Sequence, residues 1–163
     1  MKLLKTYNEL FESIVTNLDL TNKKLTELPE LPDTLERLYC SFNKIKKIQK
    51  LPDTLERLYC TNNKLTELPE LPTTLKHLNC GNNKLTELPE LPNTLETLYC
   101  QDNELTELPE LPDTLETLYC QDNDLPYKDL VGYWKWFHEY YPIHYPVKYR
   151  KYLKKQNRKK FNL

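Results

Sequence analysis

Five cysteines recur at twenty-residue intervals, and thiols at such a spacing could form disulfides, hold a metal ion or act as nucleophiles. They are Cys40, Cys60, Cys80, Cys100 and Cys120. Disulfide pairing would leave one of the five without a partner, and an intracellular compartment disfavours oxidation. A metal site favours clustered spacings such as CxxC, which the sequence lacks. We therefore predict small buried core residues, whose thiols are made unreactive by burial.

The three histidines, His77, His138 and His144, do not complete a catalytic set with these thiols. His77 precedes Cys80 by an odd number of positions, so in a strand the two side chains point to opposite faces. The sequence also lacks a glycine-rich phosphate loop and a nucleophile elbow. These observations predict a non-enzymatic protein with no catalytic residues, no cofactor and no metal site.

The cysteines belong to a repeat that fills most of the chain. Aligned on Leu31, Leu51, Leu71, Leu91 and Leu111, each unit follows LPxTLxxLxCxxNxLxxLPx with few changes, and residues 11–30 form a degenerate first copy. A short fixed period means that one unit cannot bury its apolar face alone, so neighbouring units must stack into a continuous core. We predict six repeats within residues 11–130, at 11–30, 31–50, 51–70, 71–90, 91–110 and 111–130.

Each repeat should contribute one short strand to a parallel sheet. Leu38 and Cys40 alternate with Arg37 and Tyr39, which is the pattern of a strand with one buried face. Prolines in the connecting stretches fix φ and remove N–H donors, so the return segments should be extended or polyproline-like.

Both ends of the repeat array need covers, because an open end exposes core and an unpaired strand edge. Apolar residues at helical spacing predict an N-terminal helical cap over residues 1–15 and a C-terminal helical cap over residues 127–146. Residues 147–163 are predicted to form a basic tail.

This pattern resembles the leucine-rich repeat family in its shortest, twenty-residue form, with LPxxLxxLxCxxNxL as the matching core over roughly residues 11–125. The LPxLPxxL return segments are similar to those of bacterial effector proteins of this family. The position of the cysteine and the Lys-, Asn- and Tyr-rich style are similar to giant-virus, mimivirus-like, proteins. The resemblance implies a right-handed curved solenoid with a short-stranded parallel sheet on its concave face, where partners commonly bind.

Five asparagines occupy the asparagine position of the family: Asn43, Asn63, Asn83, Asn103 and Asn123. An asparagine side chain offers donors and an acceptor to backbone groups at the turn that leaves each strand, so we predict a structural role. In the first copy this position holds Lys23, with Asn22 one place early, which makes that coil the least regular.

A column of tyrosines marks the candidate binding site on the concave face. Tyr is enriched at binding hot spots because it gives a large contact area at low entropic cost. The predicted partner-binding residues are Arg37, Tyr39, Arg57, Tyr59, His77, Asn79, Tyr99, Gln101, Tyr119 and Gln121. The alternative interpretation is that the tyrosines only pack across neighbouring strands.

The basic tail is a second candidate site, for anions. Residues 127–163 hold ten Lys and Arg against two Asp and Glu, whereas the rest of the chain is acidic. The possible anion-binding residues are Lys148, Arg150, Lys151, Lys154, Lys155, Arg158, Lys159 and Lys160. Clustered cations with interleaved tyrosines suit phosphate, nucleic acid or an anionic surface, and equally a nuclear targeting signal. The plainer alternative is a solvated tail.

The function favoured by the sequence is a monomeric protein-interaction module that binds an unidentified protein, which could be a host protein, through its concave face. The alternatives are nucleic-acid or anionic-surface binding by the tail, and a structural or decoy repeat without a specific ligand. The first ten residues lack the apolar run of a signal peptide, and no segment is suited to span a bilayer. We therefore expect an intracellular protein, in the cytoplasm (the host cytoplasm for a viral protein) or the nucleus.

Overall fold

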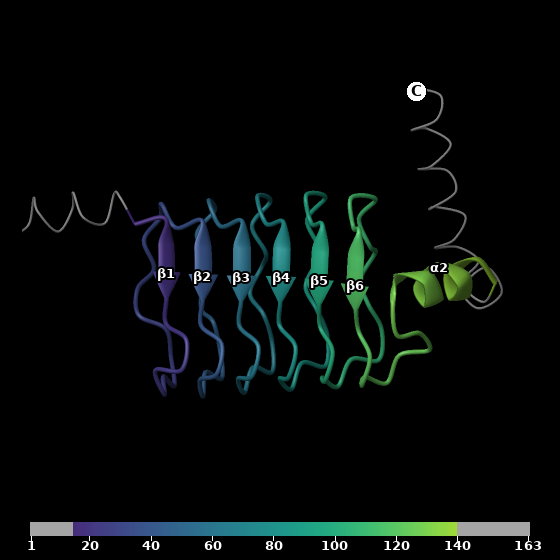
Figure 1. The fold of residues 1–163 in the computed structure, drawn as a ribbon, viewed down its shortest axis with the longest axis horizontal. Coiled ribbons are helices and arrows are strands. Elements are labelled where there is room, and N and C mark those ends of the chain that lie inside the picture. The colour runs from purple at the N-terminus through teal and green to yellow at the C-terminus, as the bar shows by residue number, and fades with distance from the viewer. Residues whose placement is uncertain (1–14, 140–163) are drawn as a thin grey trace, which may run out of the picture.

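The repeats form a single row of parallel strands in a computed structural model that describes residues 15–139. The strands are β1 (Asn17–Asp19), β2 (Arg37–Tyr39), β3 (Arg57–Tyr59), β4 (His77–Asn79), β5 (Thr97–Tyr99) and β6 (Thr117–Tyr119). They lie side by side in chain order, and one helix, α2 (Leu130–Glu139), follows β6 (Figure 1). The predicted solenoid fold, with a parallel sheet and a C-terminal helix, is confirmed. The predicted N-terminal cap lies almost wholly outside the described residues.

The register of the sheet places equivalent residues of each repeat side by side. Leu38 pairs with Leu58, Leu58 with Leu78, and Tyr39 with Tyr59. Because the step between paired residues is one full repeat at every strand, each repeat position becomes a column that crosses the sheet. The columns alternate between buried and outward positions, so the inside and the outside of the solenoid are set by neighbouring residues.

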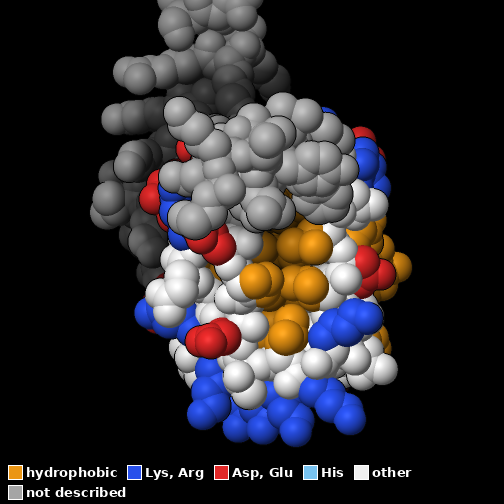
Figure 2. Space-filling model, turned by 90° about the vertical axis from the view of Figure 1, so that its left-hand side faces the viewer, with side chains coloured by type: hydrophobic (Ala, Val, Ile, Leu, Met, Phe, Trp, Pro, Cys, Tyr) orange, Lys and Arg blue, Asp and Glu red, His pale blue; other side chains and the backbone are white. Residues whose placement is uncertain are grey.

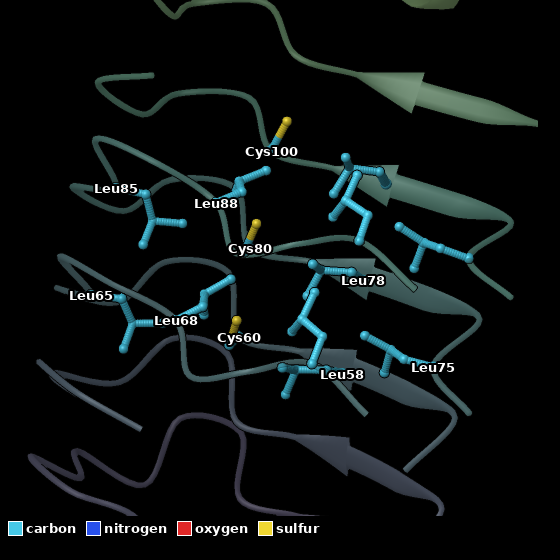
Figure 3. Packing of buried hydrophobic residues seen from close by; sticks show 14 of the residues in the cluster. Leu58, Cys60, Leu65, Leu68, Leu75, Leu78, Cys80, Leu85, Leu88 and Cys100 are labelled. Carbon is cyan, nitrogen blue, oxygen red and sulfur yellow. The ribbon is translucent and has the colours of Figure 1, made fainter. Parts of the chain in front are cut away.

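The core consists of columns of leucine with one column of cysteine. Figure 3 shows Cys60, Cys80 and Cys100 one above another, beside leucines of the strands and return segments. All five cysteines are buried and free. Burial raises the pKa of each thiol, to about 12 at Cys40 and Cys80, so the thiols stay protonated. Their surroundings are those of small core residues.

An asparagine side chain joins each coil to the coil before it. The Asn83 amide donates to the carbonyl oxygens of Cys80 (3.0 Å) and Cys60 (3.1 Å). Its Oδ1 accepts from the backbone N–H of Leu65 at 3.0 Å. Asn63, Asn103 and Asn123 repeat this arrangement in their own coils, and Asn43 bonds to backbone groups of the irregular first coil, including the Lys23 N–H. Each asparagine therefore satisfies turn groups that no regular ladder reaches.

Threonines form a second set of links on the return side, which the sequence analysis did not single out. The Thr74 hydroxyl lies 2.9 Å from the carbonyl oxygen of Leu55 and 2.8 Å from that of Asp53, one coil back. Thr54, Thr94 and Thr114 make the equivalent contacts. The described return segments contain no helix or strand, in agreement with the placement of their prolines.

The two ends of the array differ. At the β1 end, hydrophobic side chains gather on the surface and Lys and Arg side chains lie around them (Figure 2). Leucines of the first coil, such as Leu18 and Leu25, are only partly buried there. At the other end the chain turns back along β6, where Tyr119 and Asp129 form an antiparallel bridge. The buried ring of Tyr127 then packs edge to face against the buried ring of Tyr133 in α2. Within residues 15–139, no helix has the length and apolar character needed to cross a membrane.

We predict that Asn83→Ala destabilises the fold by roughly 1–3 kcal/mol. It leaves the Leu65 N–H without an acceptor and removes one of the two amide donors at the carbonyl oxygens of Cys60 and Cys80. Urea unfolding followed by circular dichroism measures this cost. Lys84→Ala, at the exposed neighbouring position, is the control and should change stability by less than about 0.5 kcal/mol. Equal costs for the two variants would contradict the linking role of the asparagine.

We also predict that Cys80→Ser costs about 1–3 kcal/mol, because it buries a hydroxyl in the leucine core. The Cys80 thiol lies 3.6 Å from the carbonyl oxygen of Tyr99, a long contact for a shorter Ser side chain to preserve. Cys80→Ala is the matched variant without a polar atom, and the same unfolding measurement compares all three proteins. A serine variant as stable as the parent would contradict the buried, apolar setting of this column.

Candidate protein-binding face

The outer face of the sheet consists of the side chains that alternate with the buried Leu and Cys columns. It comprises three columns: Arg37, Arg57, His77, Thr97 and Thr117; Tyr39, Tyr59, Asn79, Tyr99 and Tyr119; and Ser41, Thr61, Gly81, Gln101 and Gln121. The structure thus brings all ten predicted partner-binding residues into one surface. The strand register fixes the first two columns, and the third column lies just after the strands, where each turn begins.

The tyrosines of the central column stack in two pairs. The rings of Tyr39 and Tyr59 are 5.0 Å apart with an interplanar angle of 4°. Tyr99 and Tyr119 are also 5.0 Å apart, at 8°. Tyr119 at the end of the column is 47% exposed, and the other three are half-buried. The stacked rings pack across neighbouring strands and stay partly exposed on the outer face.

The column is interrupted at β4, where Asn79 stands between the two tyrosine pairs. Its Oδ1 accepts a hydrogen bond from the backbone N–H of Gly81 at 3.3 Å, so the amide turns along its own strand. Gly81 is the only glycine in its column, and the Gln101 side chain lies over it, because a Cβ on Gly81 would meet Gln101 Nε2 at 2.7 Å. Gln101 Oε1 is buried and makes no hydrogen bond with any described residue.

The charges of the face are concentrated at its β2–β4 side. The Glu56 carboxylate bonds to Lys76 Nζ at 3.0 Å, which lowers the pKa of Glu56. Burial, with the charge of Arg57 as a second cause, lowers the pKa of His77, which therefore stays neutral near pH 7. Arg57 Nε is buried and has no hydrogen-bond partner among residues 15–139. Carboxylates of Glu36 and Glu96 lie 3.9 Å from Arg37 and 4.0 Å from His77, so this half of the face carries charges of both signs.

Phe42 is an exposed aromatic residue that the sequence analysis missed. It is 57% exposed, and its φ of 58° lies in the left-handed region. The equivalent residues in the following coils, Asn62, Asn82, Asp102 and Asp122, have the same conformation and belong to the types that tolerate it. Phenylalanine is costly there both in backbone strain and in exposed apolar area. A comparison of this repeat position down the chain would have found it.

The other candidate residues stay apart from this face. The Cys80 thiol lies in the core and His77 lies on the outer face, so the structure does not bring them together. Within residues 15–139, no group of His, Cys, Asp and Glu side chains is placed to hold a metal ion. A groove of about 470 Å³ on the return side, between the first two coils, contains none of the predicted site residues. The predicted anion-binding residues of the tail lie outside the described part of the chain.

Comparisons with known proteins agree with this architecture. The family model for leucine rich repeats (2 copies) matches residues 33–73, 53–93 and 73–113. No curated protein matches the chain. The chain is similar to the solved structure of the Shigella effector LRR domain, with a TM-score of 0.68 and 36% identity, over 74% of this chain and 55% of that one.

It is also similar to YopM from Yersinia enterocolitica WA-314, with a TM-score of 0.62 and 43% identity over 63% of this chain. The chain spans 23% of the YopM chain and about half of the Shigella domain. The similarity to giant-virus proteins stays a prediction. The repeats, the sheet and the two comparisons together place the chain in the leucine-rich repeat family.

Proposed function

We propose that this chain is a non-enzymatic interaction module that binds a protein segment through the outer face of its sheet. The observation that carries the proposal is the tyrosine column, Tyr39, Tyr59, Tyr99 and Tyr119, which lies outside the leucine core. The core is complete without these rings, since the Leu and Cys columns fill it. Large aromatic side chains held rigidly on a regular surface are typical of binding hot spots.

The two sides of the face differ in charge, which supports an extended partner segment whose own charge changes along its length. Arg37 and Arg57 lie on its β2–β3 side, whereas Asp102 and Asp122 lie at the edge of its β5–β6 side. Charges at the rim of an interface steer a partner and fix its register more than they add affinity. We expect the partner segment to be acidic where it meets the arginines and to cross several strands.

The likeness to effector proteins supports a host protein as the partner and the host cytoplasm as the place of action. The similar Shigella structure is that of an effector LRR domain, and this chain shares its repeat architecture. Anion binding by residues 148–160 remains the alternative. That segment lies outside the described residues, and a version of the chain that ends at Tyr145 tests its role.

We predict that Phe42→Asn raises stability and weakens partner binding at the same time. Asparagine tolerates the left-handed conformation, so removing the strain should stabilise the fold by about 1 kcal/mol. Loss of an exposed aromatic contact should weaken binding if Phe42 touches the partner. Thermal unfolding and capture from a lysate measure the two effects. Phe42→Tyr, which keeps the ring and the strain, is the control. A variant that gains stability and keeps full capture would remove Phe42 from the interface.

We predict that replacing Tyr59 and Tyr99 by Ser abolishes capture of a protein partner from a cell lysate, because each change removes one ring of a stacked pair. The fold should survive with a cost of roughly 1–3 kcal/mol for the two lost stacks. Glu87→Ser with Glu107→Ser, on the exposed return side, is the matched control and should capture normally. A third version ends at Tyr145 and lacks the basic tail.

Two outcomes would contradict the proposed face. Capture by the tyrosine variant at the parent level would show that the rings only pack against each other. Loss of a salt-sensitive nucleic acid only in the shortened version would make the tail the functional segment.

A further inference from the structure

We propose that the interruption of the tyrosine column at Asn79 is a slot for one aromatic side chain of the partner, a tyrosine or tryptophan. The inference deepens the function proposed above and rests on it. It concerns the space between Tyr59 and Tyr99, above Asn79, with Gln101 on one side. A partner ring in this slot would join the two stacked pairs into one continuous stack.

The spacing of the column defines the size of the slot. Within each pair the rings are 5.0 Å apart, which is the step from one strand to the next. Tyr59 and Tyr99 are separated by two such steps, so their rings are about 10 Å apart. A single flat ring midway would lie about 5 Å from each neighbour, within the range of favourable aromatic pairs. The slot therefore fits one aromatic ring and is too narrow for two.

The slot is open because the coil of β4 carries small residues, Asn79 and Gly81, in the second and third columns of the face. Asn79 stands where the other four regular coils have tyrosine, and Gly81 follows it after one buried residue, Cys80. The Asn79 amide is held by the backbone N–H of Gly81, so it lies along the strand rather than between the rings. The two exceptions to the repeat thus fall side by side, on one coil.

Gln101 supplies a hydrogen-bonding group at the border of the slot. Its side chain reaches back across Gly81, and its buried Oε1 has no hydrogen-bond partner among the described residues. A buried acceptor without a donor is costly, so a rotation that offers it one is favourable. A tyrosine hydroxyl or an indole N–H can supply this donor, whereas phenylalanine cannot. This distinguishes Tyr and Trp from a purely apolar ring.

The surrounding charges favour a neutral ring over a planar cation. An arginine guanidinium could also stack between aromatic rings. The slot, however, has Arg57 on the preceding strand, and Lys76 lies beside His77 in the same coil. Glu56 is already paired with Lys76, and the Glu96 carboxylate, 4.0 Å from His77, is half exposed to water, so neither offers much to a second cation. A neutral Tyr or Trp side chain avoids this repulsion.

A titration with small aromatic probes tests the slot directly. The full chain, labelled with ¹⁵N, is titrated with N-acetyltyrosinamide and N-acetyltryptophanamide, and N-acetylleucinamide is the control. We expect both aromatic probes to shift the amide signals of Asn79, Gly81 and Gln101, with dissociation constants on the order of millimolar. The leucine probe should leave these signals unchanged.

Asn79→Tyr is the decisive variant, because it fills the slot with the residue that the other coils carry. It should fold, unfold at a higher temperature than the parent, and weaken binding of both aromatic probes at least ~10-fold. Asn79→Ser keeps the slot open and should bind as the parent does. Aromatic probes that fail to shift these signals, or that bind Asn79→Tyr as well as the parent, would overturn the slot.

The failure of the slot can be told apart from the failure of the proposed function. If the probes do not bind but the Tyr59 and Tyr99 variant still loses capture from a lysate, the face stands and the slot is wrong. If that variant captures as the parent does, the protein-binding role of the face is wrong, whatever the probes show.

Discussion

The structure depends on the need to pair backbone groups at the turn that leaves each strand. Each strand has only three residues, and backbone bonds between coils continue into the turn after it, as from the Cys60 N–H to the Asn79 carbonyl at 2.8 Å. The turn still holds groups that these bonds do not reach, such as the Leu65 N–H. The asparagine of each repeat bonds to its own coil and to the coil before it. Coils are therefore joined by side chains as well as by packing. The threonine contacts on the return side do the same where the chain comes back.

This constraint explains why the inside of the solenoid is nearly uniform and the outside is not. A change of Leu78, Cys80 or Asn83 would disturb two neighbouring coils at once, since each lies in a column shared across the sheet. Positions such as 42, 79 and 81 carry no such obligation. They are the positions where single coils depart from the repeat, with Phe42, Asn79 and Gly81. The information that distinguishes this protein from a plain stack of copies lies in those exceptions.

Much of the architecture could be predicted from the sequence because repetition makes one correct inference hold for every coil. The alternation around Leu38 and Cys40 placed the tyrosines outside and the thiols inside, and the structure agrees. Packing of the tyrosines across neighbouring strands was the alternative that the sequence offered, and the rings do stack. The sequence did not indicate that the Asn79 amide turns to Gly81 or that Gln101 covers Gly81. These depend on side-chain rotamers, which a pattern of residue types does not determine. The buried Tyr127 and Tyr133 lie within the predicted C-terminal cap, but their packing was missed because the position equivalent to 127 holds Glu or Lys in the earlier coils and here the chain folds back on β6.

The step between strands also fixes the spacing of equivalent groups on the outer face. Neighbouring coils offer equivalent groups every ~4.8 Å, whereas an extended peptide that crosses them presents side chains to one face every ~6.7 Å. Because the two spacings differ, a side chain of the peptide lies directly opposite a coil at only a few positions. A peptide that lies across this sheet therefore cannot match every coil in turn, and added identical coils would lengthen the surface without adding equally good contacts. Selectivity on such a surface depends on where a peptide side chain lies opposite a coil, and a single atypical coil is enough to fix that position.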